Sequence, residues 1–185
     1  MRSRVAGTLA TLLFPLLACS AGQKGAPMTL TITSPAFAAN ASIPSQFTCE
    51  GANISPELKW SGVPPQAKSL ALIVDDPDAP DPAHPKTTWV HWVAYDIPAS
   101  ASGAAENAGS QGIPGARLGT NDFGNPGWGG PCPPIGRHRY FFKLFALDTQ
   151  LGDLGKPHKA ALEKAMRGHI LARGELVGTY QKTKT

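Results

Sequence analysis

The segment 69–91, with the sequence SLALIVDDPDAPDPAHPKTTWVH, constrains the fold more than any other part of the chain. Its apolar run from Leu70 to Val74 predicts a strand that is buried on both faces of a sheet and ends at Val74. Aspartates and prolines follow at once, and a second apolar run begins at Thr88 and contains His91. Carboxylates at a strand end, beside a loop stiffened by prolines, predict a fixed polar pocket.

The rest of the chain predicts a mainly β protein. Alternating or continuous apolar residues indicate further strands at 28–33, 88–97, 139–147 and 170–180, and the segment 54–60 is expected to be a loop that enters a short edge strand. Only residues 157–169 have a convincing helical pattern, with Pro157 in the first turn and Gly168 at the end. The segment 98–134 is so long and so rich in glycine and proline that it is expected to be functional or a lid. We therefore predict an antiparallel β-sandwich-like domain with one or two peripheral helices.

Two candidate site features also have ordinary structural explanations. Strict alternation in the strand 88–97 places Trp89, His91, Val93 and Tyr95 on one face. A lone histidine in such a strand is more often a hydrogen-bonded core residue than a ligand. The aspartates of the segment 76–78 are likewise typical of turns, in which they accept hydrogen bonds from loop amides.

The N-terminus has the features of an export signal. Arg2 and Arg4 precede the apolar stretch 5–18, which is too short for an ordinary membrane span. The small residues before Cys19 are similar to a bacterial lipobox, in which Cys19 would be lipidated, whereas cleavage after Ala21 would release a periplasmic or secreted protein. Sensitivity of processing to globomycin distinguishes the two. The predicted organisation is a signal peptide at 1–19, a tether at 20–27, a domain at 28–182 and a polar tail at 183–185.

Export out of the cytoplasm determines the expected oxidation state of the cysteines. With Cys19 set aside, Cys49 and Cys132 remain as a pair in an oxidising compartment, so a disulfide is expected between them. Closing so long a loop contributes about 4 kcal/mol in the chain-entropy model. Two cysteines far apart in sequence, without a third, make a poor zinc site.

Enzyme and nucleic-acid-binding classes find little support. The chain has no Gly-x-Ser-x-Gly elbow, His-Glu-x-x-His helix, P-loop or dinucleotide fingerprint. Its net charge of +4 is not gathered into a basic block, so no nucleic-acid partner is expected. Cys132 beside His138 could be a nucleophile, but the disulfide competes with that role. A metal could be bound by Asp76, Asp78, His91 and His138, because mixed carboxylate and imidazole ligands suit zinc.

The residues favour a small anion site instead. His91 and His138 would donate hydrogen bonds, and the glycine-rich loop 127–136 would add backbone amides. Asp76 would orient an imidazole or accept a hydrogen bond from a ligand. We accordingly predict a binding protein without catalytic residues, cofactor or metal, and a metal-dependent hydrolase as a less favoured alternative.

Six short motifs occur in order along the chain: FTCEG at 47–51, DPDAP at 76–80, WVHW at 89–92, NDFG at 121–124, GGPCPP at 129–134 and GRHRY at 136–140. Together they resemble the phosphatidylethanolamine-binding protein family, also called Raf kinase inhibitor-like, in its bacterial YbhB/YbcL branch. The resemblance covers residues 28–182, nearly the whole mature chain.

This resemblance implies a β-sandwich with a small cavity at one end that takes phosphate-like groups, including phospholipid headgroups. Matched by motif, the ligand-binding residues would be Asp76, Trp89, His91, Gly130, Pro131, His138 and Tyr140. Asp78 and Pro80 would be structural, with a cis peptide before Pro80. Eukaryotic relatives have a tyrosine shortly before the tryptophan-containing strand, where this chain has Lys86 or Thr87, so the same headgroup selectivity is not implied.

The predicted function is therefore an exported binding protein for a small anionic ligand, such as phosphate or a phospholipid headgroup. The alternative implied by relatives is a module that inhibits or regulates a kinase or protease through protein contact at the pocket rim, especially the loop 104–128. Contact with a membrane is expected only through a lipid anchor. The expected location is the bacterial envelope or the periplasm.

Overall fold

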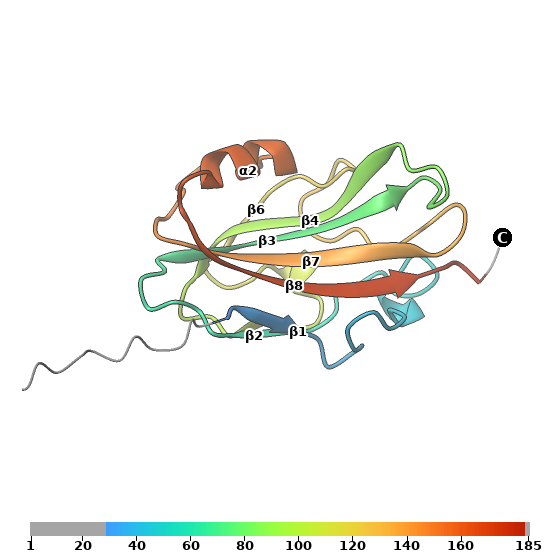
Figure 1. The fold of residues 1–185 in the computed structure, drawn as a ribbon, viewed down its shortest axis with the longest axis horizontal. Helices are drawn as coiled ribbons and strands as arrows, with labels where there is room; N and C mark the ends of the chain where they lie inside the picture. Colours follow the sequence, from blue (N-terminus) through green and yellow to red (C-terminus); the bar gives the residue numbers. More distant parts are fainter. Residues whose placement is uncertain (1–28, 184–185) are drawn as a thin grey trace, which may run out of the picture.

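The structure, a computed structural model, describes residues 29–183. Within this range eight strands form two antiparallel sheets that lie face to face (Figure 1). The large sheet has the order β6-β4-β3-β7-β8 and the small sheet the order β1-β2-β5. The strands are β1 (Thr31–Thr33), β2 (Leu58–Ser61), β3 (Ser69–Ala79), β4 (Thr87–Pro98), β5 (Gly103–Ala104), β6 (Arg117–Leu118), β7 (His138–Leu147) and β8 (Ile170–Tyr180). The predicted fold class is confirmed, whereas the predicted signal peptide, Cys19 and tether lie outside the described residues.

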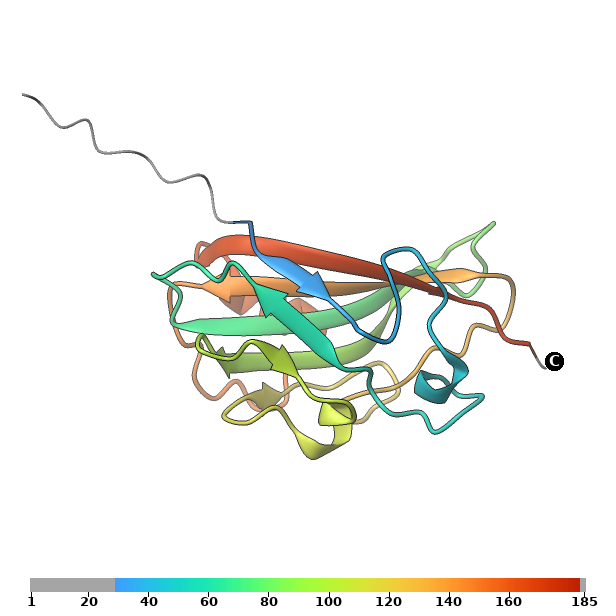
Figure 2. The same cartoon turned by 90° about the horizontal axis from the view of Figure 1, so that it is seen from below.

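Two apolar layers hold the elements together. The first lies between the two sheets, and Figure 2 shows the small sheet in front of the large one. In it, Ile32 and Trp60 of the small sheet belong to the same buried cluster as Leu72 of β3. The second lies on the opposite face of the large sheet, under helix α2 (Lys159–Met166), and includes Leu162 and Met166. Figure 1 shows α2 and the small sheet on opposite sides of the large sheet. This arrangement buries β3 on both faces, as its apolar run predicts.

Strand β3 does not end at Val74 as predicted but continues to Ala79, through the acidic residues. Asp75, Asp76 and Asp78 are each at most 4% exposed as whole residues. Each carboxylate has a basic partner on β7. The acidic residues can therefore remain buried in the sheet, although their sequence is typical of a solvated turn. The pairs are Asp75 with Lys143, Asp76 with His138 and Asp78 with Arg139, each with a shortest nitrogen–oxygen distance of 2.7 Å.

The alternation predicted for β4 is interrupted at His91. Val74 of β3 lies opposite Trp92, and the next residue of β3 lies opposite Val90, so His91 is the extra residue of a β-bulge. As a result Val90 and Val93 both belong to the cluster under α2, and Trp92 to the cluster between the sheets. The prediction that His91 shares a face with Val93 and Tyr95 was wrong. The extra residue of the bulge moves the side chains that follow it to the opposite face of the sheet from the one strict alternation gives.

The segment 98–134 is more regular than predicted. It contributes β5 to the small sheet and β6 to the edge of the large sheet, next to β4. It also contains the one-turn helix α1 (Ala108–Gln111), and a short 3-10 helix, η1 (Ser45–Phe47), precedes β2. Such short elements leave too little periodic pattern to be recognised in a sequence.

Several boundaries also differ from prediction. Strand β1 begins at Thr31, later than predicted, and α2 is shorter than the predicted helix, whereas β2 begins at Leu58, after a loop as expected. Pro157 precedes the N-cap residue His158, and Gly168, with a φ of +82°, follows the last turn. None of the helices within residues 29–183 is long and apolar enough to span a bilayer.

Cys49 and Cys132 form the predicted disulfide, with a Cα–Cα distance of 5.4 Å across a sequence separation of 83 residues. The backbone N–H of Cys49 also donates to the carbonyl of Pro131 at 3.1 Å. The bond therefore fixes the loop after η1 to the segment that leads into β7.

Asp75 supports a prediction about stability. Its carboxylate is fully buried and accepts from Lys143 at 2.7 and 2.9 Å, and the Lys159 ammonium of α2 lies 3.3 Å away. Partial burial is the largest single influence on the pKa of Lys159 and lowers it, but the charges of Asp75 and Glu163 and the hydrogen bonds to them together outweigh burial and raise this pKa overall. Replacing both lysines leaves a buried carboxylate without a cation, which costs about 3–5 kcal/mol.

We therefore expect Lys143→Met with Lys159→Met to lower the free energy of unfolding in urea by that amount. Adding Asp75→Asn to the double variant removes the buried charge and should recover part of the loss. Lys68→Met, at an exposed lysine, is the control. A double variant as stable as the wild type would contradict the interpretation.

Candidate functional site

A cavity of about 270 Å³ lies where β3 ends and β4 and β7 begin. Antiparallel pairing brings these three strand ends together, and the loops 121–129 and 131–134 close the remaining sides. The cavity is lined by Asp76, Ala79, Pro80, Trp89, His91, Phe123, Cys132, Pro133, Pro134, His138 and Tyr140. Most of the wall is apolar, and the polar groups are few.

The cavity gathers five of the seven predicted ligand-binding residues: Asp76, Trp89, His91, His138 and Tyr140. Gly130 instead lines an adjoining hollow of about 260 Å³ that shares Phe123 and Cys132 with the cavity. Pro131 lines neither space. Pro80, predicted to be structural, lines the cavity and follows a cis peptide bond, as the resemblance implied.

Asp76 and His138 form a buried pair. His138 Nδ1 lies 2.7 Å from one Asp76 oxygen, and the other oxygen accepts from the backbone N–H of Asp78 at 2.8 Å. His138 Nε2 lies 2.9 Å from the carbonyl of Ile135 and must carry a proton, because a carbonyl can only accept. A proton also lies between Nδ1 and the carboxylate. Both ring nitrogens of His138 are therefore engaged within the protein.

His91 is engaged on one side only. Its Nδ1 donates to the carbonyl of Gly129 at 2.5 Å, and this fixes Nδ1 as the protonated nitrogen of the neutral ring. Its Nε2 is buried and has no hydrogen-bond partner among residues 29–183. Burial is the main cause that lowers the pKa of His91, against the opposing hydrogen bond to Gly129 and the charge of Asp76. Nε2 is therefore a hydrogen-bond acceptor at neutral pH.

Tyr140 places a hydroxyl beside that ring. The centres of the two rings are 5.1 Å apart, and the Tyr140 hydroxyl is a second buried atom without a hydrogen-bond partner in the described part of the chain. Burial raises the pKa of Tyr140, and the charge of the Asp76 carboxylate and its approach to the hydroxyl raise it further. The hydroxyl therefore keeps its proton and is a potential donor.

The mouth of the cavity is aromatic. Trp89 is 37% exposed and Phe123 is 44% exposed, and their rings meet edge to face at 5.5 Å between centres. The Phe123 ring also meets the His91 ring edge to face, with 5.6 Å between the ring centres. The buried side chain of Asn121 holds this loop in place, since its oxygen accepts from the backbone N–H of Phe123 and of Asn125.

Five lining residues were not among the predicted ligand-binding residues: Ala79, Phe123, Cys132, Pro133 and Pro134. All of them lie within motifs that carry the resemblance, and this was the available signal. Phe123 was the hardest to place, because its loop reaches the cavity through pairing with the edge of β4: Asp122 N–H donates to the Val90 carbonyl.

Asp78 points away from the group proposed as a metal site. Its carboxylate accepts from the backbone N–H and the side chain of Arg139 at 2.7–2.9 Å. Within residues 29–183, no three His, Cys, Asp or Glu side chains gather into a group that could hold a metal ion. The position of Asp78 is consistent with the structural role proposed for it.

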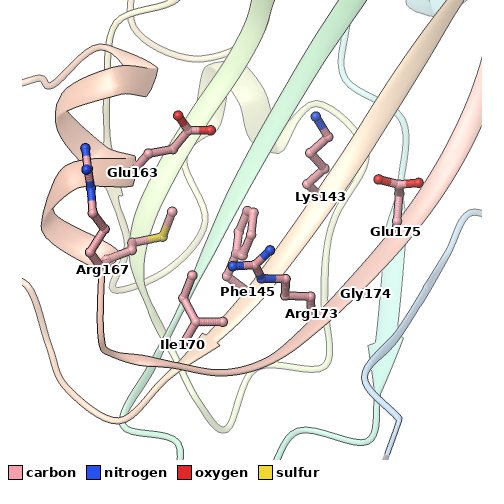
Figure 3. Close-up of a pocket in the computed structure, with 9 residues that line it drawn as sticks. Lys143, Phe145, Glu163, Arg167, Ile170, Arg173, Gly174 and Glu175 are labelled. Atoms are coloured by element: carbon pink, nitrogen blue, oxygen red, sulfur yellow. The ribbon is translucent and has the colours of Figure 1, made fainter.

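A wider groove of about 530 Å³ lies between α2, β7 and β8 (Figure 3). The lysine and arginines on its walls alternate with Glu163 and Glu175, and the Arg173 guanidinium lies 5.7 Å from the centre of the Phe145 ring. The groove contains none of the predicted site residues and none of the buried unpartnered polar atoms found within residues 29–183. The smaller cavity is therefore the candidate site.

A family profile, related sequences and solved structures all match this chain and indicate the same family. The profile described as "Phosphatidylethanolamine-binding protein" matches residues 33–181. A UPF0098 protein of Methanothermobacter thermautotrophicus is 47% identical over 155 residues, which cover 83% of this chain and 99% of the relative. A UPF0098 protein of Chlamydia pneumoniae is 44% identical over 154 residues, which cover 83% of this chain and all of the relative.

Solved structures agree. A structure described as a putative phosphatidylethanolamine-binding protein homologue, CT736 from Chlamydia trachomatis, matches with a TM-score of 0.77 and 43% identity, over 84% of this chain and 99% of that one. Escherichia coli YbcL, described as a new member of the mammalian PEBP family, matches with a TM-score of 0.75 and 33% identity, over 83% of this chain and 99% of that one.

The Asp78–Arg139 pair generates a prediction about pH. Hydrogen bonds from the Arg139 side chain, against partial opposition from burial, lower the pKa of Asp78 from its ordinary value of 3.8. A lowered pKa means that the ionised carboxylate stabilises the folded state above pH 3.8, and that this contribution is lost as the pH falls through the folded-state pKa. Because Arg139 is largely exposed, the contribution is about 1–3 kcal/mol.

Asp78→Asn should therefore lower the free energy of unfolding by this amount at pH 7, and the difference from the wild type should shrink below pH 4. Urea titrations between pH 3 and pH 7 measure both values. Asp153→Asn, at a carboxylate whose side chain is 73% exposed, is the control. A difference that is independent of pH would contradict the assignment.

Proposed function

Because the chain belongs to the phosphatidylethanolamine-binding protein family, we propose that its cavity binds a small ligand with a phosphate-like anionic group. The family description names a phospholipid whose headgroup joins a phosphate to an ethanolamine. The proposal is a binding function rather than a catalytic one. It places the ligand against His91 and Tyr140, with Asp76 and His138 as the framework behind them.

The observation that carries the proposal is the pair of buried, unpartnered polar atoms on His91 and Tyr140. Five such side-chain atoms occur within residues 29–183, and these two belong to residues that line the cavity. Buried polar atoms in native proteins almost always have a partner, and each one without a partner requires an explanation. A polar ligand in the cavity that reaches both residues would supply these partners.

Size and charge support a small anion. At about 270 Å³, the cavity is at or below the lower end of the range for drug-sized ligands, which favours a headgroup or a free phosphate compound. The Tyr140 hydroxyl can donate to an anionic oxygen. His138 is held between Asp76 and the Ile135 carbonyl and forms part of the same wall.

Chemistry in the cavity is disfavoured because it lacks a competent nucleophile. Cys132 is held in the disulfide and cannot supply a thiolate. The Tyr140 hydroxyl has a raised pKa and is a poor nucleophile at neutral pH. Asp76 and His138 are saturated by each other and by the backbone, which suits them to positioning.

We expect phosphoethanolamine to bind with a one-to-one stoichiometry in isothermal titration calorimetry at pH 6. His91→Ala and Tyr140→Phe should each weaken binding at least tenfold, because each removes one of the two polar atoms that the ligand satisfies. His84→Ala is the matched control, since the His84 side chain is 82% exposed on a turn. His138→Ala is less informative, because it also strips Asp76 of its partner. Unchanged affinity in both test variants would exclude this site.

The rim supports a second candidate, regulation of a kinase or protease through protein contact. Trp89, Phe123 and Ile135 are three of the four large apolar side chains that are exposed within residues 29–183, and all three lie at or next to the cavity. Exposed apolar patches of this kind mark interaction sites.

A protein partner would dock on this rim and would not need the cavity. A partner captured by affinity purification should then be retained by His91→Ala and lost in the double variant Phe123→Ser and Ile135→Ser. Leu171→Ser, at the fourth exposed apolar side chain, is the matched control. A partner that is lost in His91→Ala and retained in the rim variant would contradict rim docking.

A further inference from the structure

Strand β8 forms one border of the large sheet, and in the described part of the chain only its C-terminal half is covered by another segment (Figure 2). There the Val177 carbonyl accepts from the backbone N–H of Asn40. The N–H and the carbonyl of Thr179 bond to the backbone of Ala41 and Ile43. Because these bonds lie outside the sheet, the odd-numbered residues of this half point their backbone groups away from β7.

The N-terminal half of β8 continues the same alternation without such a neighbour. Its pairing with β7 is uninterrupted from Ala172 to Tyr180, so the N–H and carbonyl groups of Arg173 and Glu175 also point away from β7. Neither residue has another backbone hydrogen-bond partner within residues 29–183. These groups form an open edge, and such an edge is a ready template for a further strand.

The side chains of the open edge have opposite charges. Arg173 and Glu175 are both exposed, and they lie on the face of β8 that borders the groove beside α2 (Figure 3). Neither forms an ion pair with another described residue. Gly174 between them has a structural reason, because a Cβ at this position would lie 2.5 Å from the Leu30 carbonyl oxygen. The two charges have no corresponding role in the fold.

These charges determine how the edge can pair with itself. One antiparallel register places Arg173 opposite Arg173 of a second copy, and another places Glu175 opposite Glu175, so like charges repel in both. A third register places Gly174 on a two-fold axis and each Arg173 opposite Glu175 of the second copy. Like charges protect an exposed edge against self-pairing, whereas the opposite charges of this edge attract in the third register.

We propose that two copies of the chain pair through this edge of β8, with Gly174 on the two-fold axis. Arg173 of each copy exchanges backbone hydrogen bonds with Glu175 of the other, and its guanidinium faces that carboxylate. The two large sheets then form one continuous sheet. So short a pairing gives a weak dimer that depends on concentration. Because Arg173 lies opposite Phe145, far along β7 from His138, the contact is independent of the cavity and of the proposed function.

Charge reversal tests the register. Sedimentation velocity of the purified protein over a range of concentrations should show reversible dimers. Arg173→Glu and Glu175→Arg should each raise the dissociation constant at least tenfold, because each variant meets itself with like charges in both pairs. Lys86→Glu makes the same change of charge at an exposed position in the loop between β3 and β4, and it should leave dimerisation unchanged.

A mixture of the two reversed variants provides the second measurement. Arg173→Glu presents two glutamates and Glu175→Arg presents two arginines, so their charges are complementary only in a mixed dimer. With one variant fluorescently labelled, and with both shown by circular dichroism to be folded, the mixture should restore dimerisation close to the wild-type affinity. A wild type that stays monomeric at millimolar concentration would overturn the proposal. A dimer that neither reversal weakens, or a mixture that associates no more tightly than the separate variants, would also overturn it and assign association to another surface.

Discussion

The ion pairs between β3 and β7 are the interactions on which the rest of the structure depends. Strand β3 is the central strand of the large sheet and has three buried carboxylates at its end. Isolated charges in such a place would cost several kcal/mol each, so the strand can only be buried if its neighbour supplies cations in register. Strand β7 supplies the cations Arg139 and Lys143 to Asp78 and Asp75, and the imidazole of His138 to Asp76. The same pairing fixes where β7 begins, and thereby places His138 and Tyr140 at the cavity.

A second constraint comes from β4. The β-bulge at His91 inserts one residue, so that His91 and Trp92 both escape the layer under α2 while Val90 and Val93 both enter it. A regular strand would have placed His91 on the face of Val93. The core on both sides of the sheet therefore favours a register that presents the imidazole to Tyr140, and the geometry of the site is stabilised by packing.

The sequence predicted the features that depend on neighbouring residues, and it did not predict those that depend on residues far away in the chain. The long apolar strands and the Cys49–Cys132 bond follow from periodicity and from a count of cysteines. The continuation of β3 past Val74 could not be predicted, because the cations that neutralise its carboxylates lie more than 60 residues away in the sequence. The bulge at His91 was hidden for a similar reason, since it depends on the register of β3. Resemblance to a family placed most lining residues but not the hydrogen-bonding state of His138.

The hydrogen bonds of the two histidines distinguish the structural residue from the ligand-binding residue within the cavity. A histidine bonded at both nitrogens is costly to recruit, because a ligand must first replace the Ile135 carbonyl or Asp76 as its partner. His91 is bonded at Nδ1 only, and its buried Nε2 destabilises the unliganded protein because it has no partner among residues 29–183. A ligand that reaches Nε2 therefore gains a hydrogen bond without breaking another. Both histidines are buried and each bonds one backbone carbonyl, but only His138 has a second partner, the Asp76 carboxylate, and this difference gives them opposite roles. Recognition at this site is therefore determined by which polar atoms the fold leaves without a partner.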